Sequence, residues 1–309
     1  MSRAILVIAR KEFSDMIRSK RLWIILFILI LIHIGTYSMV RYASISSLKG
    51  VRRSLLVRGI ANLTNSIAIL GPILGIALGY DAISGERERG TLKLILARPV
   101  YRDSVINGKA LAGLCIVVIA MGITGLLTMA FGILIYGMSL TLDNIMRFGL
   151  YTLLSMLITL SFYAMSMLLS TLSRRSSTSL AISIIIWATF AFILPLASYI
   201  IAEAMLGPPP MMQEPGKEGI SRQFIEYSRR LAELSNKIRQ ISLITHYQVL
   251  ANVLMRSEII VNIGGRIIRR TVTLSEILSQ GWWHIAILAT FTLICFILSY
   301  VIFVRSEER

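Results

Sequence analysis

Residues 176–202 read SSTSLAISIIIWATFAFILPLASYIIA, a run of 27 residues without a single Asp, Glu, Lys or Arg. A helix needs about 20 largely apolar residues to cross a hydrocarbon core of about 30 Å. Further windows of this kind lie at residues 22–40, 59–80, 110–142, 148–173 and 277–304. The sequence therefore predicts an all-α polytopic membrane protein with six transmembrane helices.

The composition agrees with lipid as the solvent. The chain has 309 residues, of which 55% are hydrophobic and 16% charged, whereas soluble domains carry about 25% charged residues. Its net charge of +16 could indicate nucleic-acid binding, but the basic residues are not interleaved with aromatic ones in a patch. We therefore expect a membrane partner and no nucleic acid.

The basic residues also predict the orientation. An even number of spans places both termini on one side, and cytoplasmic loops carry an excess of Lys and Arg. With the termini inside, the inner segments hold 16 Lys and Arg and the short outer loops hold 6. We therefore expect a multi-pass protein of the cell membrane with cytoplasmic termini, and cytoplasmic loops at 82–109 and 173–177.

Residues 2–20 have the pattern of an amphipathic helix. At 100° per residue, one arc holds only apolar residues, and the basic ones lie outside it. The apolar residues are Ile5, Leu6, Ala9, Phe13, Met16 and Ile17. The segment is either an interfacial helix in the headgroup plane or an amphipathic helix that packs on a partner; we favour the interfacial helix.

The fourth predicted span carries hydroxyl groups at steps of three and four residues, which places them on one face of a helix. They are Thr152, Ser155, Thr159, Tyr163, Ser166 and Ser170. Either they form hydrogen bonds within and between helices, or four of them, Ser155, Thr159, Tyr163 and Ser166, line a translocation path. Packing is the favoured interpretation.

The segment 203–276 is predicted to be an external insertion between residues 1–202, which hold the first five spans, and residues 277–309, which hold the sixth span and a cytoplasmic tail. Its sequence predicts a helix from about 220 to 250 and a β-hairpin over 258–274 that turns at Gly264-Gly265. The helix has an apolar stripe from Phe224 to Ile241. This stripe needs an apolar partner, for which a second copy of the chain is one candidate.

The loop between the second and third predicted spans carries the most specific pattern. It reads DAISGERERGTLKLILARPVYR over residues 81–102: a charged turn, a short amphipathic piece at Thr91–Ala97 and a stop at Pro99. We expect Glu86 and Arg98 to be partly exposed, and the amphipathic piece to present Leu92, Ile95 and Leu96 to another protein. The alternative is a solvated, positively charged loop without a partner.

This stretch resembles the signature of the ABC-2 type permeases, closest to the branch that includes the permease of nitrous-oxide reductase maturation. The matching residues are Asp81, Glu86, Gly90, Thr91, Leu92, Leu94, Ile95, Leu96, Arg98, Pro99, Val100, Arg102 and Lys109. Residues 9–13, ARKEF, resemble the N-terminal elbow helix of that family. The sequence motifs cover residues 1–40 and 75–112, while the topology is similar throughout.

The resemblance implies the membrane subunit of an ABC transporter, with export as the expected direction. A cytoplasmic coupling helix around Thr91–Ala97 would rest in a groove of a separate ATP-hydrolysing subunit, which would bind the ATP and Mg. The site residues that it implies for this contact are Glu86, Gly90, Thr91, Leu92, Ile95, Leu96, Arg98, Pro99 and Arg102. The assembly would be a homodimer, or a heterodimer with a related permease, carrying two ATPase subunits.

No enzyme activity is expected of the chain itself. The string from Gly85 to Thr91 lacks the Lys that a phosphate-binding loop requires, and we find no catalytic triad, metal cluster or cofactor site. Cys115 and Cys295 both lie within predicted spans. A secondary transporter, or a membrane assembly factor without an ATPase, is the alternative; a secondary transporter usually needs an ionisable residue at membrane depth, for which only His33 is a candidate.

Overall fold

The computed structural model describes residues 2–45, 49–96, 101–136, 141–209, 222–255, 258–263, 266–271 and 273–306. In chain order its elements are α1 (Ser2–Ile17), α2 (Lys20–Ile45), α3 (Lys49–Gly79), α4 (Ser84–Glu88), α5 (Thr91–Leu96), α6 (Arg102–Tyr136), α7 (Leu142–Leu172), α8 (Ser176–Ala188), the π-helix η1 (Thr189–Ile193), α9 (Leu194–Leu206), α10 (Arg222–Arg239), α11 (Leu243–Met255), β1 (Glu258–Ile263), β2 (Arg266–Thr271) and α12 (Leu274–Arg305).

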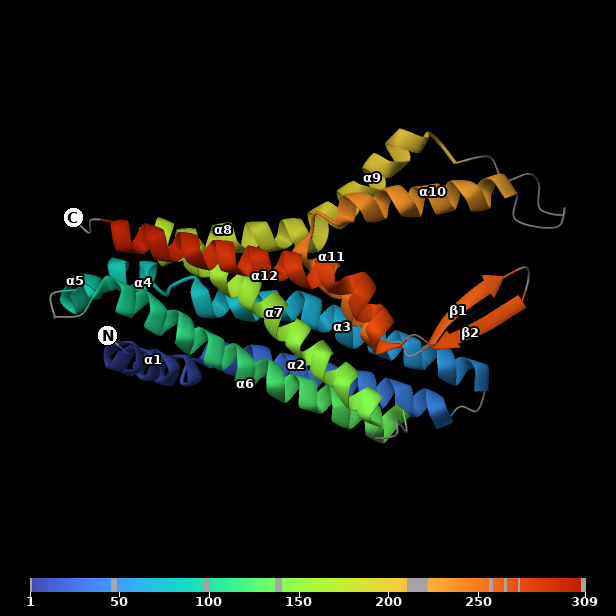
Figure 1. The fold of residues 1–309 in the computed structure, drawn as a ribbon, viewed down its shortest axis with the longest axis horizontal. Helices are drawn as coiled ribbons and strands as arrows, with labels where there is room; N and C mark the ends of the chain where they lie inside the picture. The colour runs from blue at the N-terminus through green and yellow to red at the C-terminus, as the bar shows by residue number, and fades with distance from the viewer. Residues whose placement is uncertain are drawn as a thin grey trace.

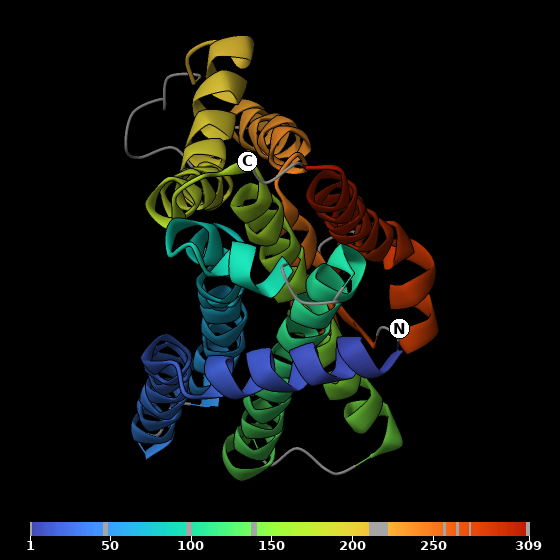
Figure 2. The same cartoon turned by 90° about the vertical axis from the view of Figure 1, so that its left-hand side faces the viewer.

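The long helices run side by side along the long axis of the molecule (Figure 1). The start of α1, the short helices α4 and α5, and the end of α12 all lie at one end of this bundle, which we call the terminus end. Figure 2, which looks at this end, shows α1 lying across the other helices and not parallel to them. It packs mainly against α6.

Five helical segments are long and apolar enough to cross a membrane among the residues that the structure describes. They are Asn62–Glu88, Arg102–Phe131, Leu142–Leu172, Ser176–Leu206 and Leu274–Arg305. They coincide with the second to sixth predicted windows, so the chain is a multi-pass membrane protein. The first window lies in the 26-residue helix α2, which is not among the five.

Helices α3 and α7 approach each other closely, because glycines line the contact face of α3. A Cβ atom added to Gly75 would lie 2.4 Å from the Thr159 carbonyl oxygen and 2.8 Å from the Tyr163 backbone nitrogen. Gly71 and Gly79, one turn away on either side, face the same helix. Pro72 does not break α3, which continues through it.

Helices α9 and α10, which we call the arm, diverge from the bundle beyond the π-helical turn η1 (Figure 1). The apolar stripe of α10 packs against α9 of the same chain. Across this contact the Ser198 and Ser235 hydroxyls are 3.1 Å apart, and the Tyr227 hydroxyl donates to the Gly207 carbonyl at 2.8 Å. Helix α9 is thus one partner of the stripe, whose last residue, Ile241, remains 68% exposed.

The expected single helix from about 220 to 250 is two helices in the structure. The chain turns at residues 240–242, where the Ser242 hydroxyl donates to the Phe190 carbonyl at 3.0 Å. The charged α10 remains in the arm, whereas the apolar α11 packs against α3, α7 and α12. Because residues such as Tyr247 and Ala251 are fully buried there, this part of the 203–276 segment belongs to the core of the bundle.

Strands β1 and β2 follow α11 and pair antiparallel, from Glu258 opposite Thr271 to Ile263 opposite Arg266. The turn at Gly264-Gly265 lies outside the described residues. At the start of α12 the Glu276 carboxylate accepts a hydrogen bond from the Thr273 backbone N–H at 3.4 Å. This contact satisfies a donor that the first turn of a helix otherwise leaves open.

Candidate functional site

The start of helix α4 is bound to the end of α7 by Ser170. The Ser170 hydroxyl accepts hydrogen bonds from the backbone N–H groups of Ile83 at 3.0 Å and Ser84 at 2.9 Å. The first N–H groups of a helix have no partner within the helix itself. Ser170 therefore supplies the missing acceptor from another helix and fixes where α4 begins.

The other side of α4 is tied to α7 and α8. The Arg87 guanidinium donates to the Thr171 carbonyl at 3.1 Å and the Ser173 carbonyl at 2.7 Å. The Glu88 carboxylate accepts from the backbone N–H and the hydroxyl of Ser176, the first residue of α8, at 3.1 and 2.9 Å. A carboxylate at a helix N-terminus also interacts favourably with the helix dipole. A displacement of α4 would therefore be passed to both helices.

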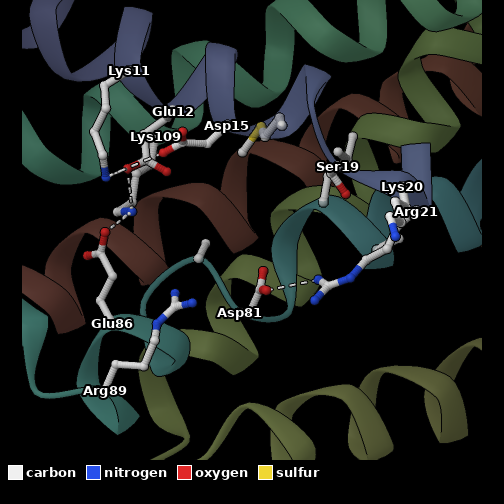
Figure 3. A pocket seen from close by; sticks show the side chains of 14 residues that line it. Lys11, Glu12, Asp15, Ser19, Lys20, Arg21, Asp81, Glu86, Arg89 and Lys109 are labelled. Carbon is white, nitrogen blue, oxygen red and sulfur yellow. Dashed lines mark hydrogen bonds and ion pairs between the residues drawn. The ribbon is translucent and has the colours of Figure 1, made fainter. Parts of the chain in front are cut away.

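A buried ion cluster connects α4 to α1 and α6. Lys109 of α6 is 2% exposed, and its ammonium lies 2.7 Å from the Glu86 carboxylate and 3.0 Å from the Glu12 carboxylate (Figure 3). Glu86 itself is buried, which corrects the expectation that it is partly exposed. Its second oxygen has no hydrogen-bond partner in the part of the chain that the structure describes. Glu86 is therefore a residue that joins helices.

The charges of this cluster keep Glu12 ionised. Burial alone would raise the pKa of the Glu12 carboxyl, but Lys109 and Lys11 act more strongly together and lower the pKa below its usual value. Lys11 lies 3.1 Å from Glu12. The Glu12 carboxylate that joins α1 to Lys109 of α6 is thus ionised near neutral pH.

A second ion pair connects α2 to α3. The Arg21 guanidinium donates to the Asp81 carboxylate at 2.9 Å and lies 4.8 Å from the centre of the Tyr80 ring. Between this pair and the Glu12–Lys109–Glu86 cluster lies a cavity of about 480 Å³. Figure 3 shows the guanidinium groups of Arg21 and Arg89 extending into it from either side of Asp81. The cavity is partly open and bounded by α1, α2, α3, α4 and α6.

The turn from α4 to α5 requires glycine, because Gly90 has φ +71°. The Thr91 hydroxyl donates to the Glu86 carbonyl at 3.2 Å and fixes the start of α5. Beyond it, the structure corrects the expected orientation of Leu92, whose side chain is 1% exposed and belongs to the core. Leu94 is 69% exposed and is the described apolar side chain that α5 presents outward.

The remaining predicted contact residues divide into two groups. Arg102 faces inward, since its guanidinium donates to the Phe303 carbonyl at 3.4 Å and to the Ser306 carbonyl, which ties the start of α6 to the end of α12. Ile95 and Leu96 belong to α5, but their side chains lie outside the described residues, as do Arg98 and Pro99 entirely.

The hydroxyl stripe of α7 is buried within the chain. Thr159 and Ser166 are fully buried, and the Ser155 and Tyr163 side chains are each 2% exposed. Ser155 lies 3.1 Å from the Tyr247 hydroxyl, and Tyr163 donates to the Lys109 carbonyl at 2.9 Å. These contacts are those of the packing interpretation, in which the hydroxyls join helices.

The residues of the ion cluster are visible in the sequence, but their contact with one another is not. Glu12, Glu86 and Lys109 all lie in the two stretches that resemble the family, yet nothing in their spacing relates α1 to α4 and α6. A second missed contact joins α11 and α12, where the ring nitrogens Nδ1 of His246 and His284 lie 2.7 Å apart. The described residues hold no group of three or more His, Cys, Asp or Glu side chains arranged to bind a metal ion.

The fold and the site define a multi-pass membrane protein in which a short surface helix is joined by buried polar contacts to most of the bundle. The model of one protein family, described as ABC-2 family transporter protein, matches residues 6–307. The chain therefore belongs to the ABC-2 transporter family, and it is an ABC transporter permease by class.

Two curated relatives carry the same description, probable ABC transporter permease protein NosY. The protein from Pseudomonas aeruginosa is 34% identical over 104 residues, which cover 34% of this chain and 36% of the relative. The protein from Stutzerimonas stutzeri is 31% identical over 134 residues, which cover 43% of this chain and 47% of the relative. The matches thus span less than half the length of these relatives, so what they transport is not transferred to this chain.

Proposed function

We propose that this chain is the membrane subunit of an exporter driven by ATP hydrolysis in a separate subunit. The observation that supports this most is the position of α4 and α5. A helix on the surface of the terminus end exposes Leu94, while the helix before it is bonded to α7, α8 and α6. A short helix that presents an apolar side chain outward is suited to a hydrophobic groove in a partner protein.

In this proposal α5 is the coupling helix, and α4 passes its movement on. A force on α5 would act on Ser170 at the end of α7, on Ser176 at the start of α8, and on Lys109 in α6. The last contact also involves α1 through Glu12. The ATP and Mg bind to the partner, and the chain itself supplies only the mechanical connection.

The assembly that follows has two permease chains and two ATPase subunits. The second permease is a copy of this chain or a related one, because one chain supplies a single coupling helix. Helix α2, the first predicted span in chain order, joins the five candidate spans and makes six. Helix α1 lies in the headgroup plane as an elbow helix, and the terminus end faces the cytoplasm. Helix α10 and the hairpin then face outward, while α9 completes the span that begins at Ser176.

Replacing Leu94 by Asp tests the coupling contact. A charge buried without a partner costs several kcal/mol, more than a weak subunit contact can absorb. We expect the variant to insert normally but to lose the co-purified ATPase, with affinity reduced at least about 10-fold, a change that 1.4 kcal/mol suffices to produce. The measurement is the ATPase recovered per permease, together with ATP-dependent transport.

The chain offers a matched control for this variant. Leu142 is 70% exposed, as Leu94 is 69% exposed, but it begins α7 at the opposite end of the bundle. Leu142→Asp should leave ATPase recovery unchanged, and Leu94→Met should preserve it. Equal ATPase recovery with Leu94→Asp and with the unmodified chain would contradict the coupling role of α5 and would favour a transporter or assembly factor without an ATPase.

The orientation has its own test. Cysteines at Leu94 in α5 and Ser228 in α10, two exposed positions, should react with a membrane-impermeant maleimide from opposite sides of the membrane. Cys115 is exposed and would first be replaced by Ala. Labelling of both positions from the same side would contradict the proposed topology.

A further inference from the structure

A second cavity, of about 440 Å³, opens on the side of the bundle between α2, α3 and α8. Its walls are almost entirely apolar and include Ile24, Ile73, Ile184 and Trp187. Ile24 and Ile184 are 57% and 45% exposed, so the cavity is a groove on the flank of the spans and not a closed void. In the proposed topology an apolar groove at this position faces the hydrocarbon of the bilayer.

The groove ends at the charged cavity of the terminus end. Arg21 and Ala77 line both cavities, so the two adjoin at these residues. The Arg21 side chain is half exposed and held by Asp81. An apolar groove that ends in a polar cavity matches an amphiphile, whose chain would lie in the groove and whose charged head would lie in the cavity.

The charges that line the polar cavity favour an anionic headgroup over a neutral or cationic one. Its lining holds five basic side chains, Lys11, Lys20, Arg21, Arg89 and Lys109, and four acidic ones, Glu12, Asp15, Asp81 and Glu86. In the described part of the chain, the acidic side chains are paired with Lys11, Arg21 and Lys109, whereas Lys20 and Arg89 form no ion pair. The cavity therefore has one net positive charge and two cations that no carboxylate of the described residues pairs with; of these, Arg89 donates through Nε to the Gly85 carbonyl at 3.0 Å.

We propose that the two cavities together bind one anionic phospholipid. One acyl chain lies in the groove over α3, and Lys20 and Arg89 bind the phosphate beside Arg21. Basic pockets between membrane helices recognise anionic headgroups in this way, and Arg favours phosphate through paired hydrogen bonds. Because the site joins α1, α2, α4 and α8, a bound lipid would hold α4 against the bundle.

The experiment measures lipid binding to the full chain in detergent by native mass spectrometry. Phosphatidylglycerol is compared with phosphatidylcholine of the same acyl chains. We expect one phosphatidylglycerol per chain to remain bound under conditions that remove phosphatidylcholine. Lys20→Gln with Arg89→Gln should weaken phosphatidylglycerol binding about 30-fold, since each cation near an anionic headgroup contributes on the order of a 5-fold change. Ile184→Trp should weaken it at least about 10-fold by filling the groove.

Matched variants make the result specific. Arg18→Gln removes an exposed cation that lines neither cavity, and Ile185→Trp enlarges the neighbouring, more exposed residue outside the groove; both should bind phosphatidylglycerol normally. Equal binding of the two lipids, or equal loss with Ile185→Trp, would overturn the site. So would a disulfide between two copies at Ile184→Cys, which would make the groove an interface. None of these readouts involves an ATPase, so they do not depend on the proposed coupling function.

Discussion

The terminus end and the arm of this molecule are held in different ways. At the terminus end, buried charges and backbone groups join α1, α4, α6, α7 and α8, and Lys109 is 2% exposed between two carboxylates. In the arm, α10 packs on α9 with exposed ion pairs such as Arg229 with Glu233, whose side chains are 79% and 58% exposed. The arm meets the bundle at the η1 turn and the Ser242–Phe190 contact.

This difference indicates which part of the fold should move as one unit and which part should change position more easily. Buried ion pairs lose much free energy when one partner is displaced, so the helices at the terminus end should move together. Exposed pairs contribute about 1 kcal/mol or less, and a π-helical turn is a common position for a helix to bend. The arm should therefore change position relative to the bundle more easily than α4 does.

Lys109→Met should produce the largest effect. It leaves the buried Glu86 carboxylate without its cation and Glu12 with Lys11 as its remaining ion-pair partner, and breaking a buried pair costs about 3–5 kcal/mol. We expect a large loss of thermal stability in detergent and loss of the α1–α6 contact, measured by proteolysis of the N-terminal helix. Arg229→Met in the exposed arm pair should cost at most about 0.5 kcal/mol.

A triple variant separates charge from packing in that result. Lys109→Met combined with Glu12→Gln and Glu86→Gln removes the unpaired charges but retains the shape of the cluster, and it should recover most of the lost stability. If the triple variant is as unstable as Lys109→Met, the cluster acts through packing of the lysine chain. If Arg229→Met is as damaging as Lys109→Met, the contrast between the two regions is wrong.

Much of this architecture could be predicted from the sequence, because a helix that crosses lipid needs a long stretch of apolar residues without charges. Windows without charge predict spans, and the second to sixth windows coincide with candidate spans of the structure. The four-residue spacing of Gly71, Gly75 and Gly79 is visible in the sequence and places them on one helix face, and α7 packs closely against that face. The resemblance over residues 81–102 correctly predicted the family.

Contacts between distant segments could not be predicted in the same way. The amphipathic pattern of Thr91–Ala97 predicted that Leu92 faces outward, but in the structure its side chain lies in the core. Residues 243–255 were expected to be external as part of the 203–276 insertion, and their sequence includes the polar residues His246, Gln248 and Asn252. In the structure the His246 and Gln248 side chains are paired with His284 and Asn65 of other helices. Polar side chains are tolerated inside a helix bundle where another helix offers a hydrogen-bond partner. That partner cannot be identified from one stretch of sequence considered alone.

Gly75→Ala should produce an intermediate effect and tests whether the bundle depends on close approach. The added methyl group would lie 2.4 Å from a backbone oxygen of α7, which cannot rotate away as a side chain could. Forced separation of packed elements costs about 1–3 kcal/mol. Gly35→Ala is the control, because nothing lies within 4 Å of its Cβ, and alanine should stabilise α2 by about 0.5–1 kcal/mol. Opposite shifts in the unfolding temperature are expected, and equal shifts would contradict the close α3–α7 contact.

Tyr227→Phe should produce the smallest effect, and its location matters more than its size. The variant removes the 2.8 Å hydrogen bond to the Gly207 carbonyl, which contributes about 0.5–1.5 kcal/mol. Local openings have free energies of their own, below that of global unfolding. If the arm opens separately from the bundle, the lost bond should speed amide hydrogen exchange in α9 and α10 by about 3- to 10-fold, while exchange in α7 and the unfolding temperature stay unchanged. If exchange in α7 accelerates equally, the arm and the bundle open as one unit, and α9–α10 is not an independently moving part of the transporter.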